Sequence, residues 1–142
     1  MRRSSVEGSV KLYVVAYAAA LVTIAILDGL WLGVVARGFY KSRIGPLMLD
    51  QPLWLPATVF YLVHAIGLVV FAAFPALASD SWTAAAWRGA LFGLCAYAAY
   101  DLTNLATLRG WSATLSVVDI GWGIFASAAA ATVAFLTTRA SQ

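Results

Sequence analysis

The sequence predicts an all-α membrane protein, a four-transmembrane-helix antiparallel bundle. Of its 142 residues, 63% are hydrophobic and only 11% are charged, and the mean hydropathy is +0.86. Soluble domains are roughly 45–50% apolar and roughly 25% charged. A soluble fold of this length leaves too much surface in water to hide so many apolar side chains. The apolar residues form four runs of about 25 residues, and roughly 20 suffice to cross a bilayer. We therefore expect a single integral membrane domain over residues 1–142.

The first apolar run predicts a membrane helix. Residues 1–10 are polar and predict a tail without structure of its own, and residues 11–36 form the first span. A cleaved signal peptide is the alternative. The apolar part of this run is longer than the roughly 7–15 residues of a signal core, and it contains Asp28. We therefore interpret it as an uncleaved span.

The second run follows the longest predicted loop. Residues 37–53 contain three cations and two prolines, which predict a connection between helices. Residues 54–78 form the second span. Pro56 lies in its first turn, where a missing N–H is tolerated, and Pro75 marks its end or a late kink.

The third and fourth runs complete the antiparallel arrangement. Residues 84–108 form the third span, and either Ser81 or Thr83 can cap the start of this helix. A tight turn at residues 109–112 leads into the fourth span, residues 113–138. Four spans place both termini on the same side of the membrane.

The distribution of cations indicates a lipid bilayer as the partner and excludes nucleic acid. The net charge is +3, but most of the nine basic residues lie at the ends of apolar runs, at the level of the headgroups. Five lie on the side of the termini and four on the other side. The positive-inside rule therefore places the termini in the cytoplasm, although the near tie leaves insertion in both orientations open. The single cysteine, Cys95, excludes an internal disulfide.

Small residues recur at the spacing that lets helices pack closely in lipid. We expect these ridges to pack within one chain, and a homo-oligomer formed through one of them is the alternative. The ridges are Gly29 with Gly33, Gly89 with Gly93, and Gly123 with Ser127 and Ala131.

Three aspartates lie inside apolar runs, where a charged side chain costs about 3 kcal/mol on insertion scales. They are Asp28, Asp101 and Asp119. Because the first and third spans run opposite to the fourth, all three lie in the same half of the bilayer. At about 1.5 Å per residue, the first two lie about 12 Å and the third about 8 Å inside the boundary that carries residues 37–43. We expect them to face one polar pocket.

Other polar and aromatic side chains share helix faces with these acids. An Asp-x-x-Trp spacing occurs in the first and fourth spans, and residues three apart share a face, so each indole N–H can donate to the carboxylate beside it. The third span contributes a stripe at i, i+3, i+4 and i+7. The expected ligand-binding residues are Asp28, Trp31, Tyr61, His64, Tyr97, Tyr100, Asp101, Asn104, Asp119 and Trp122.

Structural explanations for the same residues stay open. Tryptophan is common at membrane boundaries, so the repeated Asp-x-x-Trp spacing can arise by chance. Asn104 can hydrogen-bond a neighbouring helix, and His64 can serve helix packing alone. Asp101 and Asp119 can form a structural pair with Arg109 or Lys41.

Five runs of the chain resemble a family of small bacterial predicted membrane proteins, the domain of unknown function number 2177. The resemblance extends from about Lys11 into the fourth span, and Tyr100–Asn104 is its most specific part. It implies a multipass inner-membrane protein of bacterial type and no particular activity. The runs are Leu27–Gly33, Phe60–Leu62, Gly89–Gly93, Tyr97–Arg109 and Val118–Gly123.

The expected function is binding of a small molecule, an ion or a lipid headgroup by a multipass inner-membrane protein, with transport as one use. A polar site confined to one half of the bilayer argues against transport, because alternating-access sites usually lie near the midplane. A further, non-catalytic hypothesis, ranked third, is a structural partner subunit whose polar cluster fixes helix packing.

The hypothesis ranked second is a membrane enzyme that acts on a lipid or isoprenoid at the bilayer boundary. In it, Arg37, Lys41 and Arg43 hold a headgroup or phosphate, and aspartates hold Mg²⁺. The sequence shows no nucleophile–base pair and no metal-spaced set of histidines and cysteines. It therefore favours a protein that is neither an enzyme nor a metal-binding protein, and it identifies no cofactor.

Overall fold

The regular structure is helical throughout residues 2–142, which a computed structural model describes, with side chains from residue 7 onward. The first part comprises α1 (Arg2–Leu30), the π-helical segment η1 (Trp31–Val35), α2 (Arg37–Ile44) and a 3₁₀ turn, η2 (Gly45–Leu47). The second part is one continuous rod of α3 (Trp54–Leu68), the π-helical segment η3 (Val69–Ala73) and α4 (Phe74–Ala78). The last part comprises α5 (Trp82–Thr107) and α6 (Ala113–Arg139).

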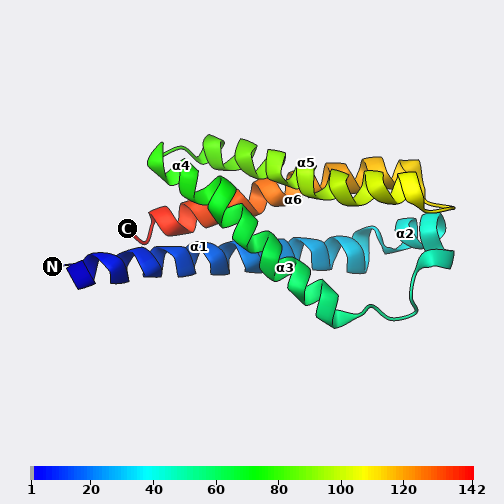
Figure 1. Ribbon diagram of the computed structural model, residues 1–142, viewed down its shortest axis with the longest axis horizontal. Coiled ribbons are helices and arrows are strands. Elements are labelled where there is room, and N and C mark those ends of the chain that lie inside the picture. The colour runs from blue at the N-terminus through cyan, green and yellow to red at the C-terminus, as the bar shows by residue number, and fades with distance from the viewer. Residues whose placement is uncertain (1) are drawn as a thin grey trace.

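Helix α6 forms the centre of the molecule. It packs most extensively against α5 and next against α1. Helix α3 crosses these helices diagonally, and its N-terminal end diverges from them (Figure 1). The two termini and the α4–α5 turn lie at one end of the molecule, and α2 and the α5–α6 turn lie at the other (Figure 1).

Three helices in the described part of the chain are long and apolar enough to cross a membrane: Glu7–Val35, Trp54–Ala78 and Ala113–Arg139. Helix α5 is not among them, because Arg88, Asp101 and Asn104, together with its glycine and tyrosine residues, lower its hydropathy. The all-α class predicted from the sequence is therefore confirmed. The four-transmembrane-helix bundle is not confirmed.

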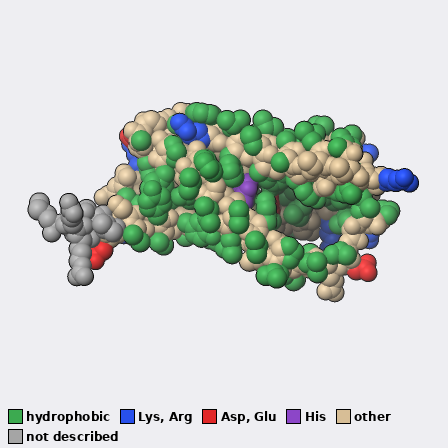
Figure 2. All heavy atoms as spheres, viewed as in Figure 1, with side chains coloured by type: hydrophobic (Ala, Val, Ile, Leu, Met, Phe, Trp, Pro, Cys, Tyr) green, Lys and Arg blue, Asp and Glu red, His purple; other side chains and the backbone are tan. Residues whose placement is uncertain are grey.

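The surface is that of a protein surrounded by lipid. Large apolar side chains are exposed along the helices, and Val34, Trp54, Leu55 and Val117 are each more than 70% exposed. On the face in Figure 2, hydrophobic side chains cover the middle and charged side chains lie toward the two ends. Monomeric soluble proteins rarely carry so large a contiguous apolar surface.

The ridges of small residues bring α5 and α6 into close contact. A Cβ atom on Gly89 would lie 2.6 Å from the backbone oxygen of Ser127, and one on Gly93 would meet the backbone oxygen of Gly123. Two of the three predicted ridges thus pack against each other within the chain. Gly29 and its ridge partner on η1 are exposed, with no neighbour within 4 Å of an added Cβ.

Two expectations for the ends of the first span were wrong. Helix α1 begins at Arg2, so residues 2–10 form a helix and not a polar tail without structure. Within the predicted loop 37–53, residues 37–44 form α2. This short helix has a physical basis in the sequence, since Ala36 and Ile44 are buried and Tyr40 is partly buried, at the spacing of one helix face.

Pro75 and Ser81 mark the end of the α3–η3–α4 rod and the start of α5, as predicted. Pro75 lies just inside α4, and the π-helical segment η3 directly precedes it. A wider turn there relieves the clash between a proline ring and the carbonyl four residues earlier. Ser81 caps α5 by accepting a hydrogen bond from the backbone N–H of Ala84 at 3.2 Å.

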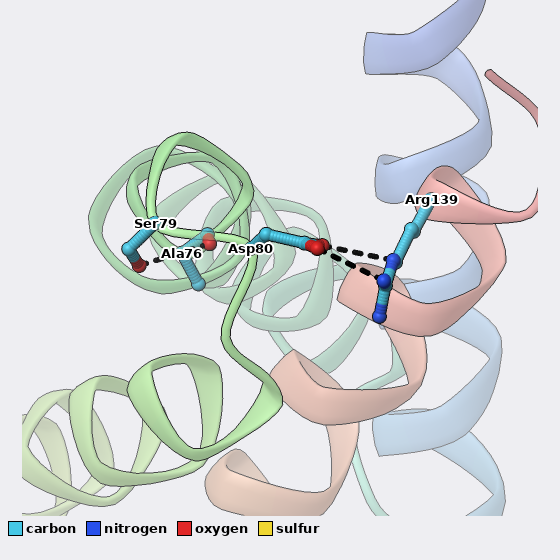
Figure 3. A network of polar contacts seen from close by, with 4 residues as sticks. All are labelled: Ala76, Ser79, Asp80 and Arg139. Carbon is cyan, nitrogen blue, oxygen red and sulfur yellow. Dashed lines mark hydrogen bonds and ion pairs between the residues drawn. The ribbon is translucent and has the colours of Figure 1, made fainter.

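The α4–α5 turn is tied to the end of α6. Asp80, which has a positive φ of 45°, forms an exposed ion pair with Arg139 at 2.8 Å (Figure 3). The turn at the opposite end, between α5 and α6, contains Gly110 with φ of 78°, a conformation that glycine adopts without steric cost.

Candidate functional site

A cavity of about 300 Å³ lies between the helices toward the end of the molecule that carries α2. It lies where α3 diverges from the other helices, and the face in Figure 2 is hollowed there. The α1–η1 rod, α2, α3, α5 and α6 all contribute to its wall. Its lining residues are Asp28, Trp31, Leu32, Tyr40, Ala57, Phe60, Tyr61, Ala96, Tyr97, Tyr100, Asp119 and Trp122.

The structure brings most of the predicted site residues to this cavity. His64, Asp101 and Asn104 are not part of its lining. The predicted residues that do line it are Asp28, Trp31, Tyr61, Tyr97, Tyr100, Asp119 and Trp122.

Asp28 is buried, with 3% of its surface exposed, and it accepts hydrogen bonds from two other helices. The indole N–H of Trp122 donates to its Oδ1 at 2.7 Å. The hydroxyl of Tyr97 donates to its Oδ2 at 3.4 Å. One carboxylate thereby connects α1 with α5 and α6.

Asp119 is 7% exposed and accepts a short hydrogen bond from the hydroxyl of Tyr40. That hydroxyl in turn accepts a hydrogen bond from the indole N–H of Trp31 at 3.3 Å. Burial and the hydrogen bond to Asp119 raise the pKa of Tyr40 above its ordinary value. Tyr40 therefore remains a neutral donor throughout the physiological pH range.

The two Asp-x-x-Trp pairs cross over between α1 and α6. Trp31 and Trp122 stack with their ring centroids 4.4 Å apart and their planes 4° apart. Each indole N–H reaches the acid of the other helix, Trp122 directly and Trp31 through Tyr40. The expectation that each indole donates to the acid of its own motif was wrong. Residues three apart on a helix are neighbours, but this spacing does not determine where their side chains point. Here the stacked indole rings point across to the other helix.

Tyr40 is the polar residue of the cavity wall that sequence reasoning missed, because it lies in the segment predicted as a loop. The available signal was its spacing of four residues from two apolar residues, Ala36 and Ile44, which are both buried in the structure. Such a spacing indicates one face of a short helix.

Asp101 lies behind the cavity wall, between α5 and α6. It is fully buried, and among the described residues neither of its carboxyl oxygens has a hydrogen-bond partner. Asp119 lies close enough to interact with its carboxyl group, and the hydroxyl of Ser116 donates to its backbone carbonyl at 3.4 Å. The predicted stripe on α5 is thus divided, with Tyr97 and Tyr100 at the cavity and Asp101 facing α6.

His64 also lies outside the cavity lining, in the packed interface of α3 with α6. Its Nε2 lies 3.0 Å from the Oγ of Ser127, and the two side chains are 4% and 0% exposed. The rings of Phe60 and Phe92 pack beside the imidazole, and their centroids lie 5.2 Å and 5.1 Å from its centroid. This environment agrees with the helix-packing alternative for His64.

The predicted headgroup-binding cations are not part of the cavity. Arg37, Lys41 and Arg43 are exposed on α2, and the guanidinium of Arg43 lies 5.5 Å from the ring centroid of Phe39. In the part of the chain that the structure describes, no three His, Cys, Asp or Glu side chains gather closely enough to hold a metal ion.

A family model described as "Predicted membrane protein (DUF2177)" matches residues 13–136. Comparison with curated proteins and with solved structures finds no match.

Proposed function

Because this chain belongs to the DUF2177 family of predicted membrane proteins, we propose that it is a multipass inner-membrane protein whose cavity binds a ligand, with transport as one use. The ligand is a small molecule, an ion or a lipid headgroup. The observation that carries this proposal is the cavity of about 300 Å³ with two buried aspartates in its wall. Ligand pockets have volumes of roughly 300–1,000 Å³ and combine apolar walls with a few polar groups.

We also propose that α5 lies in the membrane beside the three more apolar helices. Its acid, Asp101, is fully buried in the interface with α6, and Gly89 and Gly93 bring α5 against that central helix. Trp87, Leu91 and Leu94 on its outer surface are at least 40% exposed, as is expected of a face that contacts lipid. Four spans then place both termini on one side.

The test of the ligand site is a substitution that fills the cavity. Ala96 on α5 lines it, whereas Ala99 on the same helix is exposed and does not. We expect native mass spectrometry of the purified full chain to detect a bound molecule, which Ala96→Phe loses and Ala99→Phe retains. Retention of the molecule by both variants, or no bound molecule in the unaltered chain, would contradict a ligand-binding cavity. Either result would favour a polar cluster that serves helix packing alone.

A further inference from the structure

The two acids in the cavity wall lack a positive partner. In the described part of the chain, the ion pair that the structure forms is Asp80 with Arg139, at the opposite end of the molecule (Figure 3). The groups that donate to Asp28 and Asp119 are a neutral indole and neutral tyrosine hydroxyls. Neutral hydrogen bonds offset only part of the cost of burying a carboxylate, and a second carboxylate nearby adds repulsion. A bound cation would supply the positive charge that these two acids lack.

The rest of the wall is suited to an organic cation. Seven of the twelve lining residues are aromatic, including the stacked pair Trp31 and Trp122. The faces of aromatic rings are electron-rich and attract ammonium groups, and aromatic cages recognise quaternary ammonium ligands. No lysine, arginine or histidine is among the lining residues of this cavity.

We propose that the cavity binds a small organic cation, an amine or a quaternary ammonium group with an apolar substituent. Asp28 and Asp119 supply the counter-charge, and the surrounding rings supply cation–π and apolar contacts. This inference rests on the proposed function of the cavity as a ligand site and specifies the class of its ligand.

A metal ion fits the same wall poorly. Hard cations such as Mg²⁺ and Ca²⁺ take six or more oxygen ligands, and soft ones take His and Cys. Two aspartates and four tyrosines among seven aromatic rings and apolar side chains provide neither set. An anion would meet two carboxylates, since the cations of α2 lie outside the cavity.

The same chemistry can reach the cavity from two sources. A choline or ethanolamine headgroup of a lipid and a free soluble amine both carry an ammonium group beside carbon. One experiment must therefore test whether the positive charge of the ligand is recognised, and a separate comparison must distinguish a lipid headgroup from a free amine.

The test of charge compares choline with 3,3-dimethylbutan-1-ol, which has the same shape without the charge. Both are titrated calorimetrically into the purified full chain in an uncharged detergent. We expect choline to bind at least about tenfold more tightly, because the neutral alcohol lacks the charge that carboxylates and aromatic ring faces attract. Equal affinities, no choline binding, or displacement of choline by Mg²⁺ or by inorganic phosphate would each overturn the organic-cation proposal.

Charge-removing variants locate the cation. Asp28→Asn and Asp119→Asn keep the shape of the wall, and each is expected to weaken choline binding about tenfold without changing the affinity for the neutral alcohol. Asp80→Asn, at the far end of the molecule, is the matched control and keeps full affinity. Trp31→Phe, with the exposed Trp82→Phe as its control, gives a second test if an Asp variant does not fold. Unchanged choline binding in the folded cavity variants would overturn the proposal.

Two further comparisons separate the source of the ligand from failure of the site. Nanodiscs of phosphatidylcholine are compared with nanodiscs of phosphatidylglycerol. Loss of choline binding only in phosphatidylcholine identifies a lipid headgroup, and equal binding in both identifies a free amine. If Ala96→Phe abolishes binding of both probes and they bind equally, the cavity is a ligand site and only the cation class fails. If Ala96→Phe abolishes neither, the proposed function fails as well.

Discussion

Asp28 and Asp101 carry the same side chain in opposite environments. Asp28 accepts an indole N–H at 2.7 Å and a tyrosine hydroxyl at 3.4 Å, so its carboxylate holds three helices together. Asp101 is more deeply buried, and its two carboxyl oxygens have no partner among the described residues. An unsatisfied buried polar group costs about 1–3 kcal/mol, whereas a satisfied one makes a modest net contribution.

The same substitution at these two acids should therefore change stability in opposite directions. In Asp101→Asn the amide N–H₂ provides a donor beside Asp119, and we expect the free energy of unfolding to rise by about 1 kcal/mol. In Asp28→Asn the amide replaces an acceptor that faces two donors, and we expect a loss of about 1–2 kcal/mol. Thermal unfolding of the purified chain in one detergent measures both. Equal shifts of the same sign would show that the hydrogen bonds do not distinguish the two sites.

Tyr40 links pH to stability at the edge of the membrane. Burial and its hydrogen bond to Asp119 raise its pKa in the folded chain above that in the unfolded chain. Its contribution is therefore complete below the unfolded value of about 10 and is lost as the pH rises toward the folded value. We expect the midpoint of thermal unfolding to fall between about pH 9.5 and 11, and to fall less steeply in Tyr40→Phe. Parallel profiles for the two proteins would contradict this role of Tyr40.

At the scale of the elements, the apolar runs predict the long helices well. The second and fourth spans were expected at residues 54–78 and 113–138 and are observed at Trp54–Ala78 and Ala113–Arg139. Continuous hydrophobicity determines where a chain can leave water, so it sets these bounds directly. It does not predict α2, whose eight residues include three cations and are too few to show a clear periodicity.

The sequence predicted which residues lie near one another in the site, but not which of them form hydrogen bonds or ring contacts. Counting residues along antiparallel spans placed Asp28 and Asp119 at similar depth, and the structure places both in one wall. The π-helical segment that begins at Trp31 and the crossing of α3 depend on packing between helices. These two features bring Trp31 to Tyr40 and leave His64 outside the cavity lining. The spacing of residues within one helix cannot predict such contacts between helices.

The contact between α5 and α6 tolerates no added side chain at Gly93. A Cβ there would meet the backbone oxygen of Gly123 and would lie 2.7 Å from the Cβ of Ser127. We expect Gly93→Ala to separate the two helices and to lower the free energy of unfolding by about 1–3 kcal/mol. Gly121→Ala on α6 is the control, because an added Cβ there has no neighbour within 4 Å. Comparable stability of the two variants would show that the small-residue ridges are not needed for packing.

At the scale of the whole molecule, the cavity lies toward the end that carries α2. Its acids lie near α2, whereas the half of the molecule near the termini is filled by small side chains such as Ala16, Ala72, Ala130 and Ala134, each fully buried. A ligand of the proposed site would therefore reach the cavity from the α2 side or laterally past α3. A carrier that moved the ligand across the bilayer would have to separate helices that alanine and glycine now hold close together.

The orientation of the chain consequently decides which leaflet a ligand of the proposed site would come from. Five cations on the side of the termini against four on the other side favour cytoplasmic termini. In a Cys95→Ala background, a membrane-impermeant maleimide added to intact cells should label Ser42→Cys on the exposed surface of α2 and should not label Gln142→Cys at the C-terminus. Labelling of the C-terminal cysteine alone would reverse the orientation and place the cavity on the cytoplasmic side. Labelling of both cysteines would show that the chain inserts in both orientations, as the nearly equal numbers of cations on the two sides allow. The cavities of different copies would then face opposite leaflets.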